Sequence, residues 1–166
     1  MKVLNTVTVV HMAPGTYLFE YGMKGEHFYI VLGGQCELLI PNEKKIIKKK
    51  ELKTLEDEIT KLKRQLAAQN MARNFDVTES LHIGKIKNKI KEMNADVEKR
   101  KEEMKGMPDM EFFKYYYSGG YFGERALQKP QPRAGSIRTV TDCHFAAINY
   151  DAYERLWKKE DMLKES

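Results

Sequence analysis

Two different spacings of hydrophobic residues divide the chain into three segments. In residues 1–43 and 108–166, short β-branched and aromatic runs alternate with turns that contain glycine or proline. In residues 44–107, hydrophobic residues instead recur at intervals of three and four. Short bounded runs predict strands, whereas the three-four spacing predicts amphipathic helices. We therefore expect one β domain whose sequence is interrupted by a helical insertion.

The predicted turns of the N-terminal β segment follow one another at short intervals. "TVTVVHM" ends at "APG", "TYLFEYG" ends at Gly22, and Gly33–Gly34 separates the two apolar runs of "HFYIVLGGQCELLIP". The glycine pair predicts a tight connection. Short strands at this spacing are typical of an all-β barrel or sandwich. At the other end, "DAYERLWKKEDMLK" predicts a short C-terminal helix with Asp151 as its N-cap.

The insertion carries two hydrophobic seams. Their residues are Leu52, Leu55, Ile59, Leu62 and Leu66 in the first helix, and Ile86, Ile90, Met93, Val97 and Met104 in the second. Each helix is expected to be about 20–25 residues long. Because neither helix can bury its seam alone, we expect an antiparallel coiled-coil hairpin with its bend at residues 70–81. Arg100 interrupts the second seam and is expected to weaken it.

The positive charge of the chain belongs to this insertion. Residues 44–105 contain 18 Lys and Arg against 11 Asp and Glu, whereas the rest of the chain contains 11 against 13. The run "KKIIKKK", Lys44–Lys50, leaves open a contact with nucleic acid, acidic lipid or an acidic filament. A solvated helix face is the simpler interpretation of this run.

Several classes of protein are not expected. The longest apolar runs are too short to span a membrane, and the N-terminus lacks the features of a signal peptide. Cys36 and Cys143 lie far apart and form no CxxC motif, which indicates core residues of a cytoplasmic, soluble protein with reduced thiols. The four histidines have no metal-site spacing, and no set of nucleophile, base and orienting residue is evident. We expect neither an enzyme nor a cofactor.

The stretch "GGYFGERALQKPQPRAG", residues 119–135, carries the candidate chemistry. Glycines at 119, 120 and 123 allow the backbone to approach a ligand, and a short helix is predicted from Glu124. Arg133 offers a planar, bidentate donor to an anion such as a phosphate. The Glu124 carboxylate can accept a hydrogen bond from a sugar hydroxyl. Together they indicate a nucleotide with one phosphate.

"FGERAL" followed by "PRAGSI" resembles the phosphate-binding cassette of cyclic nucleotide-binding domains, in the form found in regulatory subunits of cAMP-dependent kinase. Upstream, "APGTYLFEYGMKGEHFYIVLGGQCELLIP" is similar to the first strands of the same family. The resemblance covers roughly residues 6–41 and 109–157 and leaves the hairpin out. Gly135 departs from the alanine that is usual in the family. The implied fold is a jelly-roll-like β-roll, residues 1–43 and 108–166, with the helical hairpin 44–107 inserted.

The resemblance also implies a role for each cassette residue. Glu124 would accept from the ribose 2′-hydroxyl, Arg133 would pair with the cyclic phosphate, and backbone N–H groups around the cassette would complete the site. Leu127 would relay cassette movement to the following helix. Ala134 favours cAMP over cGMP, because a threonine often stands there in cGMP-selective relatives. The predicted ligand-binding residues are Phe122, Gly123, Glu124, Arg125, Ala126, Leu127, Arg133, Ala134, Gly135 and Ser136.

The sequence therefore predicts a non-catalytic cyclic nucleotide sensor, with cAMP favoured over cGMP as ligand. A protein partner that binds the basic hairpin 44–107 is left open, and no nucleic acid is expected, because no helix-turn-helix follows the β segment. The alternative function is a structural adaptor, in which a ligand-free β-roll supports the hairpin as the working interface.

Overall fold

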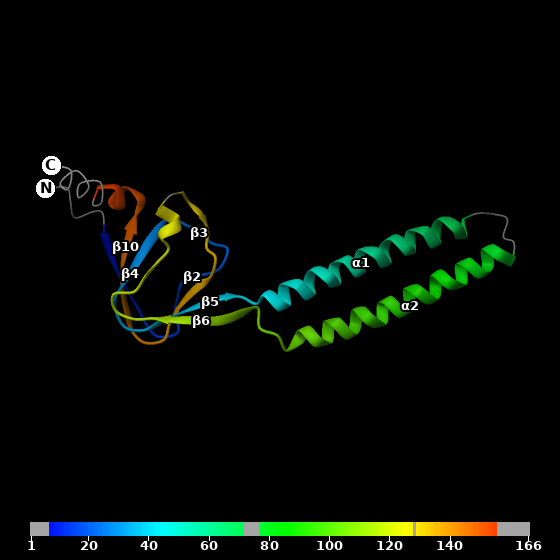
Figure 1. Cartoon of the computed structure of the whole chain (residues 1–166), viewed down its shortest axis with the longest axis horizontal. Helices are drawn as coiled ribbons and strands as arrows, with labels where there is room; N and C mark the ends of the chain where they lie inside the picture. Colours follow the sequence, from blue (N-terminus) through cyan, green and yellow to red (C-terminus); the bar gives the residue numbers. More distant parts are fainter. Residues whose placement is uncertain (1–6, 72–76, 128, 156–166) are drawn as a thin grey trace. The chain divides into compact units, whose positions relative to one another are not determined.

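The structure is a computed structural model, and it describes residues 7–71, 77–127 and 129–155. It divides into two compact units, one formed by Met1–Pro41 with Met110–Ser166 and the other by Asn42–Asp109. Each unit is described below by itself (Figure 1).

The first unit is a β-roll of antiparallel strands (Figure 1). One sheet has the order β1-β10-β4-β7, a second has the order β2-β9-β5-β6, and β3 pairs with β8. The strands are β1 Val7–Met12, β2 Tyr17–Phe19, β3 Lys24–Gly25, β4 His27–Gly33, β5 Cys36–Pro41, β6 Met110–Tyr116, β7 Tyr121–Phe122, β8 Gln131–Pro132, β9 Ser136–Thr139 and β10 Cys143–Asn149. The β-roll expected from the sequence is confirmed.

The core of the β-roll lies between the two four-stranded sheets. Its buried cluster draws on both sheets and consists of Val31, Cys36, Phe122, Ile137, Cys143 and Phe145. Cys36 and Cys143 are free thiols within this cluster, as predicted. Burial raises the pKa of Cys36 to about 12, because the apolar core disfavours the thiolate. Both cysteines are therefore packing residues.

Gly34 makes the predicted tight connection between β4 and β5, but the two strands do not form a hairpin. They belong to different sheets, so the chain crosses from one sheet to the other at this point. Gly34 has a φ of 90°, a value that residues with a Cβ atom rarely adopt. A Cβ atom at Gly34 would also collide with the backbone oxygen of Asp142.

The helical segment after β10 begins two residues earlier than predicted. Residues 150–155 are helical, and the side chain of Asn149 accepts a hydrogen bond from the backbone N–H of Ala152 at 2.8 Å. Asn149 is therefore the N-cap, and the prediction of Asp151 was wrong. The rest of the predicted helix lies outside the described residues.

The second unit is a hairpin of two long helices, α1 Glu43–Asn70 and α2 Val77–Lys105 (Figure 1). They contain 28 and 29 residues, more than the sequence spacing predicted. The first helix is longer because Asn42 caps it well before the first seam residue, with the Asn42 side chain accepting from Lys45 N at 3.1 Å. The bend is correspondingly shorter, since α2 already begins at Val77.

The two predicted seams pack on each other. The buried cluster of the hairpin contains Ile59, Ile86, Ile90 and Val97, with Leu52, Leu55, Leu62, Leu66 and Met93 packed against it. Arg100, which interrupts the second seam, contacts both helices through its side chain. Its guanidinium contacts Asp96 at 3.0 Å on its own helix and Glu51 at 3.2 Å on α1.

The base of the hairpin is closed by hydrogen bonds. Asn42, only 2% exposed, donates from its backbone N–H to Asp109 O at 2.9 Å and from its side chain to Pro108 O at 3.1 Å. Lys45 and Lys49 both contact the Asp109 carboxylate at 3.0 Å. The interpretation of Lys44–Lys50 as a solvated face was thus wrong for Lys45, whose side chain is only 15% exposed.

Candidate functional site

A cavity of about 380 Å³ opens in the β-roll beside the predicted cassette. Its walls come from β7 and the segment after it, from β8, β9 and the segment between them, and from β2, β5 and β6. They contain Phe19, Leu38, Tyr116, Phe122, Gly123, Glu124, Arg125, Ala126, Gln131, Pro132, Arg133, Ala134, Gly135 and Ile137. The fold thus brings eight of the ten predicted ligand-binding residues to one cavity, and Leu127 and Ser136 flank it in the sequence.

Arg133 is the most constrained of these residues. Its backbone N–H donates to Met23 O at 2.8 Å, and its carbonyl accepts from Gly22 N at 2.9 Å. The residue is buried, with 8% of its surface exposed. One terminal nitrogen donates to His27 O at 2.8 Å, and the guanidinium lies 4.2 Å above the Phe19 ring. The guanidinium is therefore fixed before any ligand arrives.

Arg133 lacks a counter-charge among the described residues. No carboxylate of the described chain lies within ion-pair distance of it. Burial accordingly lowers the pKa of Arg133, and the neighbouring Tyr29 hydroxyl opposes this effect only in part. A buried cation normally has an anionic partner, because desolvation is costly. The site is therefore electrostatically suited to an anion.

Two glycines allow the guanidinium to sit where it does. A Cβ atom at Gly123 would lie 2.7 Å from a terminal nitrogen of Arg133 and 3.0 Å from His27 O, and Gly123 has a φ of 87°. A Cβ atom at Gly25 would overlap the Nε atom of Arg133. The two positions are thus restricted to glycine by the same side chain.

The predicted short helix is present as a 3₁₀ helix, Glu124–Leu127. Glu124 is exposed and lines the cavity, so its carboxylate is free to accept hydrogen bonds. Gln131 fixes this segment by donating from its side chain to Arg125 O at 2.8 Å. Leu127 lies on the opposite side, buried in a cluster with Phe28, Ile148 and Ala152.

Two predicted residues have packing roles in the structure. The hydroxyl of Ser136 accepts from Tyr21 N at 2.8 Å, so it holds the segment after β2. Gly135 is buried against β5, and a Cβ atom there would lie 2.7 Å from Leu39 O. Glycine stands at position 135, where the family usually has alanine, and here the backbone at Gly135 lies close to the backbone of β5.

Sequence reasoning missed the residues that hold Arg133 from β2, β3 and β4. These are the aromatic rings of Phe19 and Tyr29, Gly25, and the carbonyl of His27. The only signal was the polar turn that contains Gly25, which carries no indication of its distant partner. Contacts across more than a hundred residues of sequence cannot be read from local spacing.

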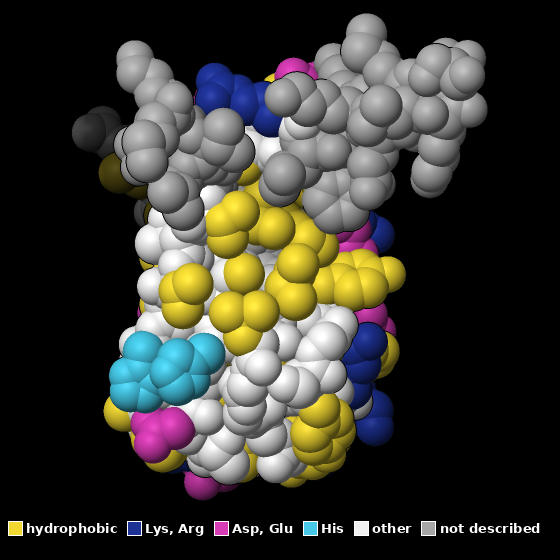
Figure 2. Space-filling model, turned by 90° about the vertical axis from the view of Figure 1, so that its left-hand side faces the viewer, with side chains coloured by type: hydrophobic (Ala, Val, Ile, Leu, Met, Phe, Trp, Pro, Cys, Tyr) yellow, Lys and Arg dark blue, Asp and Glu magenta, His cyan; other side chains and the backbone are white. Residues whose placement is uncertain are grey.

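A second cavity of about 550 Å³ lies on the β-roll near Asn149, and Lys129, the one basic residue among its described lining residues, is exposed. Figure 2 shows hydrophobic side chains and a histidine patch on one face. His11 stacks on His144 with ring centroids 4.6 Å apart, and His11 contacts Asp142 at 3.3 Å. Within residues 7–71, 77–127 and 129–155, no group of three or more metal-binding side chains is arranged to hold a metal ion. In the same ranges, no helix has the length and apolar character needed to cross a bilayer.

Comparison with known proteins relates the chain to others through structure alone. No protein-family model matches the sequence, and no curated protein is a detectable relative. Among solved structures, the catabolite activator protein of Thermus thermophilus matches with a TM-score of 0.53 and 13% identity, over 98% of this chain and 47% of that one. The c-di-GMP-responsive regulator CLP of Xanthomonas campestris matches with a TM-score of 0.50 and 14% identity, over 93% and 45%.

A kinase regulatory subunit gives a similar match. This subunit, from a cAMP-independent protein kinase A of Trypanosoma brucei in a mutant form bound to cAMP, has a TM-score of 0.50 and 14% identity, over 96% of this chain and 36% of its own. The chain thus spans less than half the length of each of these three proteins. The likenesses show the fold alone, which is the β-roll found in cyclic nucleotide-binding domains. In this chain a helical hairpin is inserted between β5 and β6.

Proposed function

We propose that the β-roll binds a cyclic nucleotide, with cAMP as the favoured ligand, and that it acts as a non-catalytic regulatory sensor. One observation carries this proposal: Arg133 is a buried, preorganised cation that lines a cavity and has no counter-charge among the described residues. The free thiols Cys36 and Cys143 suit a reducing compartment, so we place the sensor in the cytoplasm.

A cyclic phosphodiester fits this cation in charge and in shape. It carries one negative charge, and its two non-bridging oxygens match the parallel donors of a guanidinium. Formation of the pair would offset the desolvation of Arg133, which the unliganded site leaves uncompensated. Glu124, on the same cavity, provides an acceptor for a ribose hydroxyl. A cavity of about 380 Å³ lies within the usual range of small-molecule sites.

The same geometry suggests how binding is signalled. The 3₁₀ helix Glu124–Leu127 contributes Glu124 and Ala126 to the cavity and Leu127 to a cluster with Ala152 of the C-terminal helical segment. Tyr153 of that segment packs against the same cluster. A ligand that draws the 3₁₀ helix toward the phosphate would therefore shift Leu127, and with it the cluster on which the C-terminal segment packs.

The neighbours do not decide the ligand, because one is named for c-di-GMP and another for independence from cAMP. Calorimetric titration of the full chain with cAMP, cGMP and c-di-GMP tests the proposal directly. We expect saturable binding of cAMP, weaker binding of cGMP, and none of c-di-GMP. Absence of binding by all three would favour the structural adaptor, and preference for c-di-GMP would overturn the ligand assignment.

Ala134→Thr is expected to raise the affinity for cGMP relative to cAMP. Ala134 is exposed on the cavity wall, so a hydroxyl at this position would reach the ligand. One neutral hydrogen bond contributes about 0.5–1.5 kcal/mol, which corresponds to about a 2- to 13-fold change in the ratio of affinities. Competition titrations measure the ratio, and Ala134→Val is the control for side-chain size. A ratio that does not change would place the base elsewhere.

Replacement of residues 42–109 by a short Gly-Ser linker is expected to leave a folded β-roll that still binds cAMP. Pro41 and Met110 are register partners on β5 and β6, so a turn can join them. Near-ultraviolet circular dichroism reports on the β-roll, because Phe75 is the only Phe, Tyr or Trp in residues 44–107. A folded deletion protein that does not bind cAMP would show that the hairpin shapes the site, and an unfolded one would contradict the boundary.

A further inference from the structure

The hairpin has an uneven distribution of charge along its length. We define its distal half as residues 59–71 and 77–95, and its proximal half as residues 42–58 and 96–109. The distal half has two acidic residues, Glu79 and Glu92. It has seven basic residues, all exposed: Lys61, Lys63, Arg64, Lys85, Lys87, Lys89 and Lys91.

The proximal half, by contrast, has no net charge and contains several ion pairs. It contains ten basic and ten acidic residues. Ion pairs between the helices join Lys48 to Glu103 at 2.9 Å and Lys101 to Glu56 at 3.0 Å. Of the seven distal basic side chains, only Lys89 forms an ion pair with a described residue, with Glu58 at 3.5 Å. The uncompensated charge therefore lies in the distal half.

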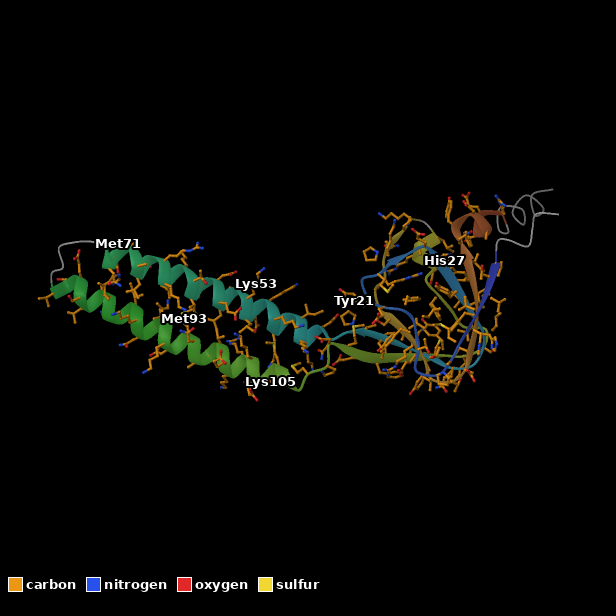
Figure 3. All side chains as sticks on the ribbon, turned by 180° about the vertical axis from the view of Figure 1, so that it is seen from behind. Tyr21, His27, Lys53, Met71, Met93 and Lys105 are labelled. Atoms are coloured by element: carbon orange, nitrogen blue, oxygen red, sulfur yellow. The ribbon has the colours of Figure 1, made fainter. Side chains whose placement is uncertain are left out.

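Exposed aliphatic side chains accompany this charge at the bend end of the hairpin. Met71 is 84% exposed, Val77 79% and Leu81 64%. In Figure 3, Met71 lies at the bend end and Lys105 at the opposite end of the hairpin. The packing between the two helices is made by the seam residues, and these three side chains are not part of that buried cluster.

We propose that the distal half binds the surface of an anionic phospholipid bilayer, with the aliphatic side chains entering the boundary between headgroups and acyl chains. Positions 61, 63 and 64 project at different angles from α1, because successive residues turn by about 100°. Charge on several sides suits an extended anionic surface. Basic residues beside exposed aliphatic ones are the combination that peripheral membrane segments use.

A bilayer fits better than nucleic acid for two reasons. Residues 59–95 contain a single Phe, Tyr or Trp on which a base could stack, Phe75, and lysine outnumbers arginine six to two. Lysine acts as a point charge and does not provide the bidentate fork that reads bases. The proposal is independent of ligand binding in the β-roll.

Sedimentation of the full chain with vesicles tests the proposal. The vesicles are phosphatidylcholine alone or phosphatidylcholine mixed with phosphatidylserine. The distal variant combines Lys61→Gln, Lys63→Gln, Lys85→Gln and Lys87→Gln. The matched control removes the same charge from exposed proximal lysines that form no ion pair with a described residue, by Lys44→Gln, Lys50→Gln, Lys53→Gln and Lys99→Gln. A third variant, Val77→Ser with Leu81→Ser, keeps every charge.

We expect binding only to vesicles that contain phosphatidylserine. At about fivefold per lysine near an anionic surface, the distal variant should bind at least about 100-fold more weakly, and the control much less so. The serine variant should bind about tenfold more weakly, through lost apolar burial. Equal losses in the two lysine variants, or unchanged binding of the serine variant, would overturn the proposal. Failure to bind vesicles alongside tight binding to RNA or to an acidic protein would overturn it as well. Far-ultraviolet circular dichroism confirms that each variant keeps its helices.

Discussion

Arg133→Lys is expected to lower the affinity for cAMP by about 30- to 1000-fold, which corresponds to about 2–4 kcal/mol. Lysine keeps the charge but loses the planar fork and the ring contact with Phe19. A lysine ammonium also lacks the planar set of donors with which Arg133 can donate to His27 O and to both phosphate oxygens at once. Calorimetric titration of the two proteins under identical salt conditions measures the difference.

A matched control for this variant is Arg125→Lys. Arg125 lines the same cavity but is exposed, so its replacement should change affinity much less. Near-ultraviolet circular dichroism shows whether the β-roll remains folded in both variants. Equal affinities of wild type and the Arg133→Lys protein would refute the assignment of Arg133 to the phosphate.

Gly34→Ala is expected to destabilise the β-roll by about 3–5 kcal/mol, through an unfavourable backbone conformation and a collision with surrounding atoms. The new Cβ atom would overlap the backbone oxygen of Asp142 and lie 2.8 Å from Sγ of Cys143. Both neighbours belong to or adjoin the core strand β10, so they cannot move freely. Urea unfolding followed in the near ultraviolet measures the loss.

Gly33→Ala provides the control at the adjacent residue. A Cβ atom at Gly33 would have no neighbour within 4 Å, and Gly33 does not have a positive φ. Its replacement should change stability by less than about 1 kcal/mol. If both alanine variants unfold at the same urea concentration, the crossing between the sheets is more adaptable than its geometry indicates.

The sequence predicted those features that rest on local spacing. The seams of the hairpin could be read because each repeats over several turns of one helix, and the cassette could be read because its residues are close together in the chain. The environment of Arg133 could not be predicted in this way, because Phe19 and His27 come close to it only after the sheets have formed.

Local capping and charge pairing were the other sources of error. Asn149 and Asp151 are both favourable N-cap residues, and which of them caps the helix depends on where β10 ends. Likewise, Lys45 was predicted to be solvated because its partner Asp109 is distant in sequence and adjacent only across the hairpin base. In each case a long-range contact decided between two locally acceptable arrangements.

The closed base of the hairpin has a consequence for the order in which the chain folds. Pairing of β5 with β6 must bring together strands separated by the whole segment Asn42–Asp109, and the entropy cost of loop closure grows with the logarithm of that separation. The hairpin contacts are formed within this segment, and the bonds of Asn42 with Pro108 and Asp109 join its ends. Once they have formed, Pro41 and Met110 are effectively neighbours. An early hairpin would therefore shorten the search that the β-roll must make, and mutations in its seam should slow refolding of the sheets even where the final stability of the β-roll is unchanged.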